Sequence, residues 1–295
     1  MSRRTLVNHR GDDAQFARVD PATALASLFR PLARGKKRAG GLEVNQFFGG
    51  IELRWHVWRE LDAFDQDVFF AIVGLLCSVN DRSEEGCYLL SAHRLDSEQN
   101  HREKLWARLN ALGGATESTT LALNTTEYAV LRACGRSDTG RDYLRLRSSL
   151  RRLANVGCTA IYHNNEGSMR LLSFVVREDG RLTVAINARL AEAIGGNQYV
   201  GMVLGERRML RGDVARIMHA WLSAWLRAGE CKAIRLDTLA KRIWAETEKG
   251  NLHKRRQLVR RAMNALVEVG WRIEISGRGQ RATANISRPN YRESG

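Results

Sequence analysis

Two stretches decide the fold: LALNTTEYAVLRACGRSDTGRDYLRLRSSLRRLANVGC (Leu121–Cys158) and IRLDTLAKRIWAETEKGNLHKRRQLVRRAMNALVEVGW (Ile234–Trp271). They align without a gap at an offset of 113 residues, from 121 to 234, so that Leu123 falls on Leu236 and Gly157 on Gly270. The order of element types also agrees between the two copies. The sequence therefore predicts an internal duplication.

Each copy predicts a short strand followed by two helices. The strands are Leu121–Leu123 and Ile234–Leu236, and Asn124 and Asp237 are expected to be N-caps of a short helix. A polar turn with glycine then precedes a longer amphipathic helix, which Gly157 or Gly270 ends as a C′ glycine. The expected buried stripes are Leu146, Ser149, Leu150 and Leu153 in the first copy, and Val259, Ala262, Met263 and Leu266 in the second.

A hairpin is expected after each glycine and a helix before each copy. The first hairpin runs from Cys158–Tyr162 to Arg170–Val176, and the second from Trp271–Ile275 to Arg281–Ile286. Asp67 and Asp213 are expected to begin the two upstream helices. Helix, strand, helix, turn, helix and hairpin is the winged-helix order, so the fold class is α+β with two tandem winged-helix domains.

The domain boundaries follow from these elements. We expect a basic flexible arm and lead-in at 1–44, winged-helix domain 1 at 45–200 with an insertion at 86–120, winged-helix domain 2 at 201–290 and a tail at 291–295. A leading hairpin from Leu42 to Val57 is expected to turn at Gly49-Gly50.

The basic charge of the chain is concentrated near its C-terminus. The chain has 295 residues and a net charge of +15, and from Gly201 onward 20 Lys and Arg stand against 9 Asp and Glu, a net charge of +11. This distribution indicates a polyanionic partner, and nucleic acid is favoured over membrane. The apolar runs are too short to span a bilayer, and the polar N-terminus does not read as a secretory signal, so a cytoplasmic location is expected.

The helix after the second turn is the predicted reader of a DNA major groove. Gln257 and Asn264 suit adenine edges and Arg261 suits guanine, whereas the other basic side chains suit phosphates. In the hairpin, Arg278 and Arg281 flank a glycine-rich tip. The predicted DNA-binding residues of the second copy are Lys254, Arg255, Arg256, Gln257, Arg260, Arg261, Asn264, Arg278 and Arg281.

The equivalent helix of the first copy has a different surface. It carries the candidate DNA-binding residues Arg141, Arg145, Arg147 and Arg151, but Leu144 and Ser148 among its outward positions are poorer base readers. Two interpretations stay open for it: a less specific DNA-binding unit, or a module for self-association.

Residues typical of catalysis or metal binding are dispersed. The seven histidines are scattered, the five cysteines form no C-x-x-C pair, and no G-x-x-x-x-G-K-[ST] motif occurs. We therefore expect no enzymatic activity, no metal and no cofactor.

The order of several short motifs resembles the replication initiator C proteins of IncQ-type plasmids. The resemblance covers nearly the whole chain from Asp20, with the insertion at 86–120 matching least. The motifs are Asp20-Pro21-Ala22, Leu28-Phe29-Arg30, the segment from Asp179 to Asn187 with Leu190 and Ala193, Leu236-Asp237-Thr238-Leu239, Lys254-Arg255-Arg256-Gln257, Val269-Gly270-Trp271 and Ser287-Arg288-Pro289.

The resemblance implies a non-catalytic initiator of plasmid replication. Such proteins bind tandem direct repeats (iterons) of the origin as duplex DNA, help to open the adjacent AT-rich region and support loading of a plasmid-encoded helicase, with a primase acting later. It also implies a homodimer through the first domain. The main alternative is a winged-helix transcriptional repressor that binds an operator, and a pure protein-interaction module is a third possibility.

Overall fold

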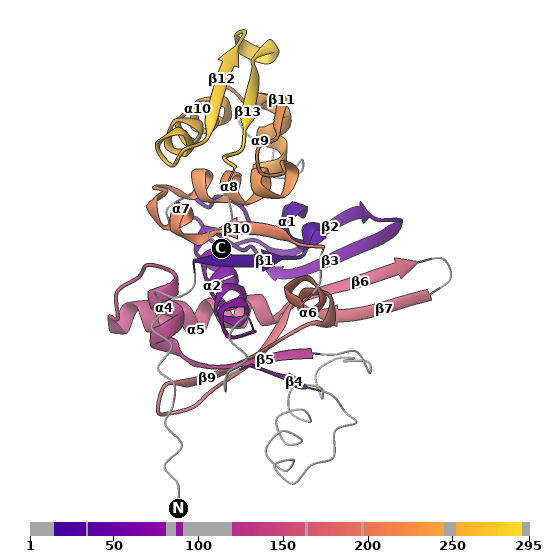
Figure 1. Ribbon diagram of the computed structural model, residues 1–295, viewed down its shortest axis with the longest axis vertical. Helices are drawn as coiled ribbons and strands as arrows, with labels where there is room; N and C mark the ends of the chain where they lie inside the picture. The colour runs from indigo at the N-terminus through magenta and orange to yellow at the C-terminus, as the bar shows by residue number, and fades with distance from the viewer. Residues whose placement is uncertain are drawn as a thin grey trace, which may run out of the picture.

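Helix α2 (Ala63–Asn80) runs through the middle of the molecule and is buried from Ala63 to Cys77 (Figure 1). A helix enclosed by protein needs apolar side chains around most of its circumference, and the run FFAIVGLLC at 69–77 supplies them. The computed structural model describes residues 15–33, 35–80, 87–90, 120–162, 165–195, 198–244 and 252–290. The other residues, including most of the predicted insertion at 86–120, lie outside this description.

Two units of the chain have the same order of elements: helix, strand, helix, helix, strand, strand. The first unit consists of α2, β5 (Thr120–Thr126), α4 (Glu127–Ala133), α5 (Gly140–Ala154), β8 (Leu172–Val176) and β9 (Arg181–Ile186). The second unit consists of α8 (Asp213–Trp225), β11 (Cys231–Arg235), α9 (Leu236–Trp244), α10 (Leu252–Glu268), β12 (Arg272–Ser276) and β13 (Thr283–Ser287), with a short 3-10 turn, η2 (Gly279–Arg281), before β13.

The sheets of the two units are also ordered alike. In the second unit the strand order is β11–β13–β12, and in the first unit β5–β9–β8, with β4 (Cys87–Leu90) on the outer edge of β5. All neighbouring strands are antiparallel. The duplication seen in the sequence therefore extends to the pairing of the strands.

A second four-stranded sheet, with the strand order β2–β3–β6–β7, is formed by the part of the chain that precedes the second unit. The hairpin β2 (Gly40–Phe48) and β3 (Ile51–Arg59) turns at Gly49 and Gly50, both with positive φ, as predicted. A second hairpin, β6 (Val156–Tyr162) and β7 (Asn165–Arg170), pairs with it through β3. Figure 1 shows both hairpins extending on the same side of the molecule.

This pairing corrects the hairpin predicted for the first copy. The return strand of β6 is β7, and the segment from Arg170 to Val176 is divided at Leu171 between two sheets. The pair that corresponds to β12 and β13 is β8 and β9. Alternation of apolar residues locates a strand but not its partner, which is why the sequence joined the wrong strands.

Four predicted helix ends also differ from the structure. Helix α2 begins at Ala63, one turn before Asp67, the residue predicted to begin it. Asn124 lies inside β5, which continues to Thr126, and the Thr126 hydroxyl caps α4 by accepting the N–H of Ala129 at 3.1 Å. Asp237 lies in the first turn of α9 rather than at its N-cap. Gly157 is part of β6, because α5 ends at Ala154, whereas Gly270 follows α10 with φ 96°, as expected for a C′ glycine.

Strands and a short helix occupy parts of 16–33 and 35–44, in contrast to the flexible arm and lead-in predicted at 1–44. Strand β1 (Phe16–Val19) pairs with β10 (Val200–Val203), and α1 (Pro21–Leu25) is capped by the Asp20 side chain, which accepts the N–H of Thr23 at 2.8 Å. Val19 and Phe29 belong to the core. The apolar residues of this stretch are spaced too irregularly to signal folding by periodicity.

Polar contacts join the two units. Helix α6 (Ala188–Gly195) follows the first unit, and α7 (Leu204–Met209) leads from β10 into the second. The buried guanidinium of Arg207 on α7 lies 2.8 Å from Asp67 of α2, and Arg216 of α8 lies 3.0 Å from the other oxygen of that carboxylate. One carboxylate on the central helix thus holds the start of the second unit.

Candidate nucleic-acid interface

Helix α10 has one buried and one exposed face. Val259, Ala262, Met263 and Leu266 are all buried, as the 3.6-residue period predicted. Their spacing fixes the opposite face, which carries polar and basic groups. The residues exposed there are Lys254, Gln257, Arg261, Asn264 and Glu268, with Arg260 half-buried at the flank.

Two of the arginines predicted to contact phosphate instead contact the protein. Arg255 is only 8% exposed, and its guanidinium lies 5.5 Å from the ring centroid of Trp244. Arg256 donates twice to Asp237 of α9, from Nε at 2.5 Å and Nη2 at 2.9 Å. These contacts fix α10 against α9, so neither side chain belongs to the exposed face. A run of basic residues in a sequence does not show which of their side chains turn toward the protein.

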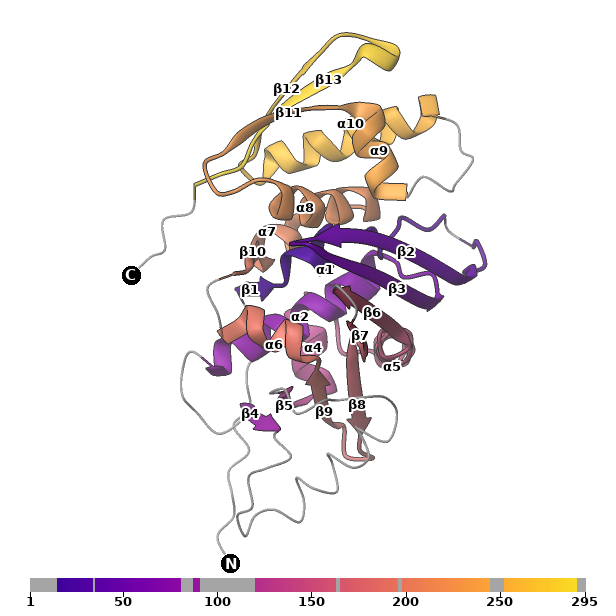
Figure 2. The same cartoon turned by 90° about the vertical axis from the view of Figure 1, so that its right-hand side faces the viewer.

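The turn between β12 and β13 lies beside this face. Arg278 and Arg281 are exposed there, on either side of Gly279. A Cβ at Gly277 would lie 2.8 Å from the carbonyl oxygen of Arg281, and its φ is 72°, so the tight turn requires glycine. Figure 2 shows this turn and the N-terminal end of α10 at the same end of the second unit. The structure thus brings the two predicted groups of arginines together.

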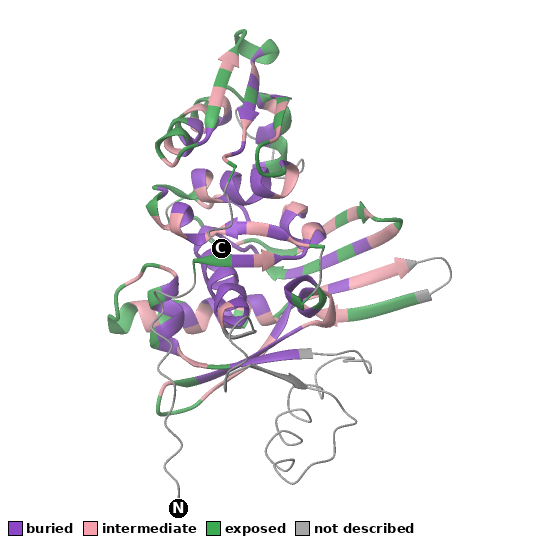
Figure 3. Ribbon diagram, viewed as in Figure 1, coloured by how far each residue is buried: buried purple, intermediate pink, exposed green. Residues whose placement is uncertain are grey.

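Helix α5 of the first unit presents a second basic face. Leu146, Ser149, Leu150 and Leu153 are buried as predicted. Opposite them lie Arg141, Leu144, Arg145 and Arg151, all exposed. Figure 3 shows exposed residues along the outer sides of α5 and α10.

Internal contacts restrain two arginines of α5. Arg147 donates twice to Glu127 of α4, both times at 2.7 Å, much as Arg256 does to Asp237. The Arg145 guanidinium lies 4.0 Å from the ring centroid of Phe64, although the residue is exposed. Arg147 is therefore a link between two helices, and Arg141 and Arg151 are the outward basic groups of this helix.

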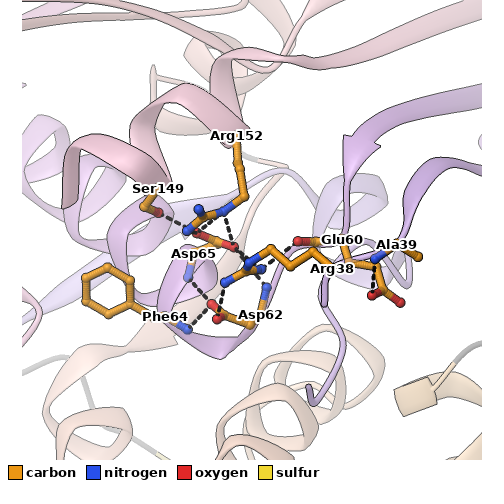
Figure 4. Close-up of polar contacts among 8 residues, drawn as sticks. All are labelled: Arg38, Ala39, Glu60, Asp62, Phe64, Asp65, Ser149 and Arg152. Atoms are coloured by element: carbon orange, nitrogen blue, oxygen red, sulfur yellow. Dashed lines mark hydrogen bonds and ion pairs between the residues drawn. The ribbon is translucent and has the colours of Figure 1, made fainter. Parts of the chain in front are cut away.

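A buried ion cluster fixes α5 to the start of α2 (Figure 4). Asp65 accepts from Ser149 at 2.6 Å and from Arg152 Nη2 at 2.7 Å, and Arg38 from the lead-in to β2 reaches both Asp65 and Asp62. Burial raises the pKa of Asp65 above its ordinary value even though Arg152 opposes the shift. Ser149, an irregularity in the apolar stripe, is thereby explained as a donor to Asp65.

A buried histidine lies on the first helix of the second unit. His219 Nε2 of α8 lies 2.9 Å from Glu206 Oε2, which also accepts from the indole N–H of Trp271 at 3.2 Å. Burial lowers the pKa of His219, so the neutral ring is favoured in the folded protein. This contact joins α7, α8 and the start of the β12–β13 hairpin.

The described part of the chain has neither a clustered metal site nor a membrane-spanning helix. Within them, no group of three or more His, Cys, Asp or Glu side chains is arranged to hold a metal ion. Across the same part of the chain, no helix is both long enough and apolar enough to cross a bilayer.

Fold and surface together define the class: a mixed α/β protein of two related units, each with an exposed basic helix. The family model of replication protein C (RepC) matches residues 11–290, and the chain belongs to this family. No significant match to a curated protein was found.

Solved structures with a similar fold come from RctB. A crystal structure of domains 2 and 3 of RctB, from selenomethionine derivatives, covers 91% of this chain and 98% of its own, with a TM-score of 0.55 and 10% identity. A second structure of the same domains covers 91% and 96%, with a TM-score of 0.53 and 11% identity. At this identity the likeness concerns the fold.

Proposed function

We propose that this protein initiates plasmid replication by binding tandem repeats of the origin as duplex DNA. The observation that carries the proposal is the exposed face of α10, where Gln257, Arg261 and Asn264 lie together above a buried apolar stripe. These are the side chains that pair with adenine and guanine edges in a major groove. Membership of the replication protein C family supports the origin as the place where they act.

Both units are proposed to be winged helices. The order of elements and the strand order β11–β13–β12 support this assignment for the second unit, and β5–β9–β8 supports it for the first. On this view α10 and α5 are the groove-reading helices, and the turn with Arg278 and Arg281 is a wing that approaches the backbone or minor groove.

The phosphate contacts are assigned to the side chains that remain on the surface. Of those that the sequence suggested, Lys254, Arg260, Arg278 and Arg281 in the second unit and Arg141 and Arg151 in the first are retained. Arg255, Arg256 and Arg147 are omitted because protein groups hold them. About six neutralised phosphates would give log K a slope of roughly −5 against log salt.

The finer steps of initiation are part of the same proposal. We infer that the bound protein helps to open an adjacent AT-rich region, supports loading of a plasmid-encoded helicase in the cytoplasm, and self-associates through the first unit, as in IncQ-type initiators. The proposed role is non-catalytic and needs no cofactor, which agrees with a sequence that holds no P-loop.

A transcriptional repressor built from the same modules is the second candidate. A repressor usually reads a palindrome as a symmetric dimer, whereas two unlike reading helices in one chain suit direct repeats. The difference between the outward residues of α5 and α10 favours the initiator.

Equilibrium binding to origin DNA tests the proposal. The purified chain is titrated with a duplex of one direct repeat, with a scrambled duplex and with a palindromic operator-like duplex, at several salt concentrations. We expect tighter binding to the repeat and a steep salt dependence. Equal affinity for all three duplexes, or affinity that salt leaves unchanged, contradicts the proposal.

A further inference from the structure

The outermost residue of α5 is a leucine. At about 100° per residue, Leu144 lies about 170° from the centre of the buried stripe. It is 68% exposed, among the most exposed large apolar side chains in the described part of the chain. At the offset of 113 residues the same position on α10 is Gln257, which is also exposed.

The surroundings of Leu144 are cationic. Arg141, Arg145 and Arg151 are exposed on the same helix, on both flanks of the leucine. Tyr128 of α4 is 47% exposed, and Arg132 on that helix is exposed as well. The acidic groups on these two helices lie away from this face, because Glu127 is buried against Arg147 and Asp142, in the first turn of α5, lies about 160° around the helix from Leu144.

We propose that Leu144 reads thymine by packing on its C5-methyl group in the major groove. This inference rests on the proposed function. The methyl group is the only apolar feature that a base pair presents in that groove, and small apolar side chains recognise it there. Arg141 and Arg151, on the two flanks of the leucine, then face phosphates on either side of the base edge. The first unit thus favours A·T pairs through an apolar contact, whereas the second unit reads base edges by hydrogen bonding.

A protein partner fits this surface less well. Arginines that lose their water against another protein need carboxylates in return, and the desolvation of unpaired charges opposes such a contact. Leu144 and Tyr128 together also offer too little apolar area for a stable protein interface. Duplex DNA supplies both an apolar methyl group and the compensating anions.

The methyl group can be removed without changing the base pair. Single thymines of an origin repeat are replaced by deoxyuridine, one at a time, and affinity is measured for the wild type, Leu144→Ala and Leu144→Met. Gln257→Ala is the matched control, because it truncates the equivalent outward side chain of α10. Both positions are on the surface, so the variants are expected to fold, which circular dichroism checks.

One methyl group buried against a side chain is worth about a fourfold change in affinity. We expect at least one thymine at which deoxyuridine weakens the wild type about three- to fourfold, with no weakening for Leu144→Ala. Leu144→Met should still lose affinity when deoxyuridine replaces that thymine. Gln257→Ala removes a different base contact and binds more weakly overall, but deoxyuridine at that thymine should weaken it by the same factor as the wild type.

Two results overturn the inference while leaving DNA binding intact. One is equal dependence on the methyl group in the wild type and Leu144→Ala. The other is a change in the oligomeric state of Leu144→Ala in sedimentation, with methyl dependence unchanged, which would assign the surface to self-association. If the wild type does not bind the repeat at all, the proposed function itself fails.

Discussion

The two units share a plan but differ at their surfaces and in their interiors. Both order their strands alike and both join the second helix to the third by a doubly bonded Arg–carboxylate pair, Arg147–Glu127 in one and Arg256–Asp237 in the other. On the outside, Leu144 stands where the second unit has Gln257. The shared features maintain the fold of each unit. The residues that differ on the outside face the solvent, where they can give each unit its own binding specificity.

The interiors differ in the polar group on the first helix. In the first unit α2 carries Asp65, which binds α5 through Ser149 and Arg152. In the second unit α8 carries His219, which binds Glu206. A buried ion cluster thus anchors the first unit and a neutral imidazole ring anchors the second. Substitutions of Asp65 and His219 should therefore change the free energy of unfolding by unequal amounts.

The largest expected effect is from Asp65→Ala. The change leaves Arg38 and Arg152 without their shared carboxylate in a buried site, and breaking such a cluster costs about 3–5 kcal/mol. Urea unfolding measures the loss in the free energy of unfolding. Asp179→Ala, which removes an exposed ion pair with Arg181, is the control and should cost less than about 1 kcal/mol. Equal losses would show that the cluster does not anchor the first unit.

Arg261→Ala should have the next largest effect, on DNA binding. Loss of one base contact costs about 1–3 kcal/mol at a single base pair of the repeat, and should relax specificity there. Competition with repeats altered at each position measures this. Arg151→Ala on α5 serves for comparison and should weaken all sequences alike. A uniform loss for Arg261→Ala as well would contradict the assignment of base reading to α10.

In the second unit a pH effect is expected from His219. Because the pKa of His219 is lowered in the folded state, its contribution is complete above about pH 6.5 and is lost as the pH falls toward the folded pKa. The slope is at most about 1.4 kcal/mol per pH unit. Unfolding of the wild type and His219→Gln between pH 8 and 5.5 measures it. The variant should lose less stability on acidification, and identical slopes would exclude His219 as the source.

The smallest effect compares two cations of α10, the exposed Lys254 and Arg256, which is paired with Asp237. Lys254→Ala should reduce the magnitude of the salt slope by about one, whereas Arg256→Ala should leave the slope unchanged, because Asp237 already neutralises that guanidinium. Anisotropy titrations at several salt concentrations compare the two. A reduced slope for Arg256→Ala would mean that the ion pair opens on DNA.

The features that the sequence predicted correctly are those set by local rules, above all by the spacing of apolar residues along a helix. The buried stripes of α5 and α10, the turn at Gly49-Gly50 and the C′ role of Gly270 all follow from local rules, and the structure confirms them. Strand partners depend on contacts between distant residues, so β8 and β9 were not recognised as the counterpart of β12 and β13.

The candidate interface was predictable in outline but not side chain by side chain. Outward positions of α10 follow from helix geometry, and Lys254, Gln257, Arg261 and Asn264 are indeed exposed. The inward turn of Arg255 onto Trp244 and the pairing of Arg256 with Asp237 depend on α9, whose orientation no sequence period encodes. Asp237 did carry a signal, since an acid near the start of one helix and a basic run on the next suggest an ion pair.

The pairing of β1 with β10 also bears on how the chain folds while it is being made. Phe16 stands opposite Val203, so β1, the first strand in the described part of the chain, pairs with a strand nearly two hundred residues later. Domains usually fold one after another as they emerge, N-terminal first. Here β1 can pair only after β10, in the connection to the second unit, has been synthesised, so the edge of the first unit is completed late.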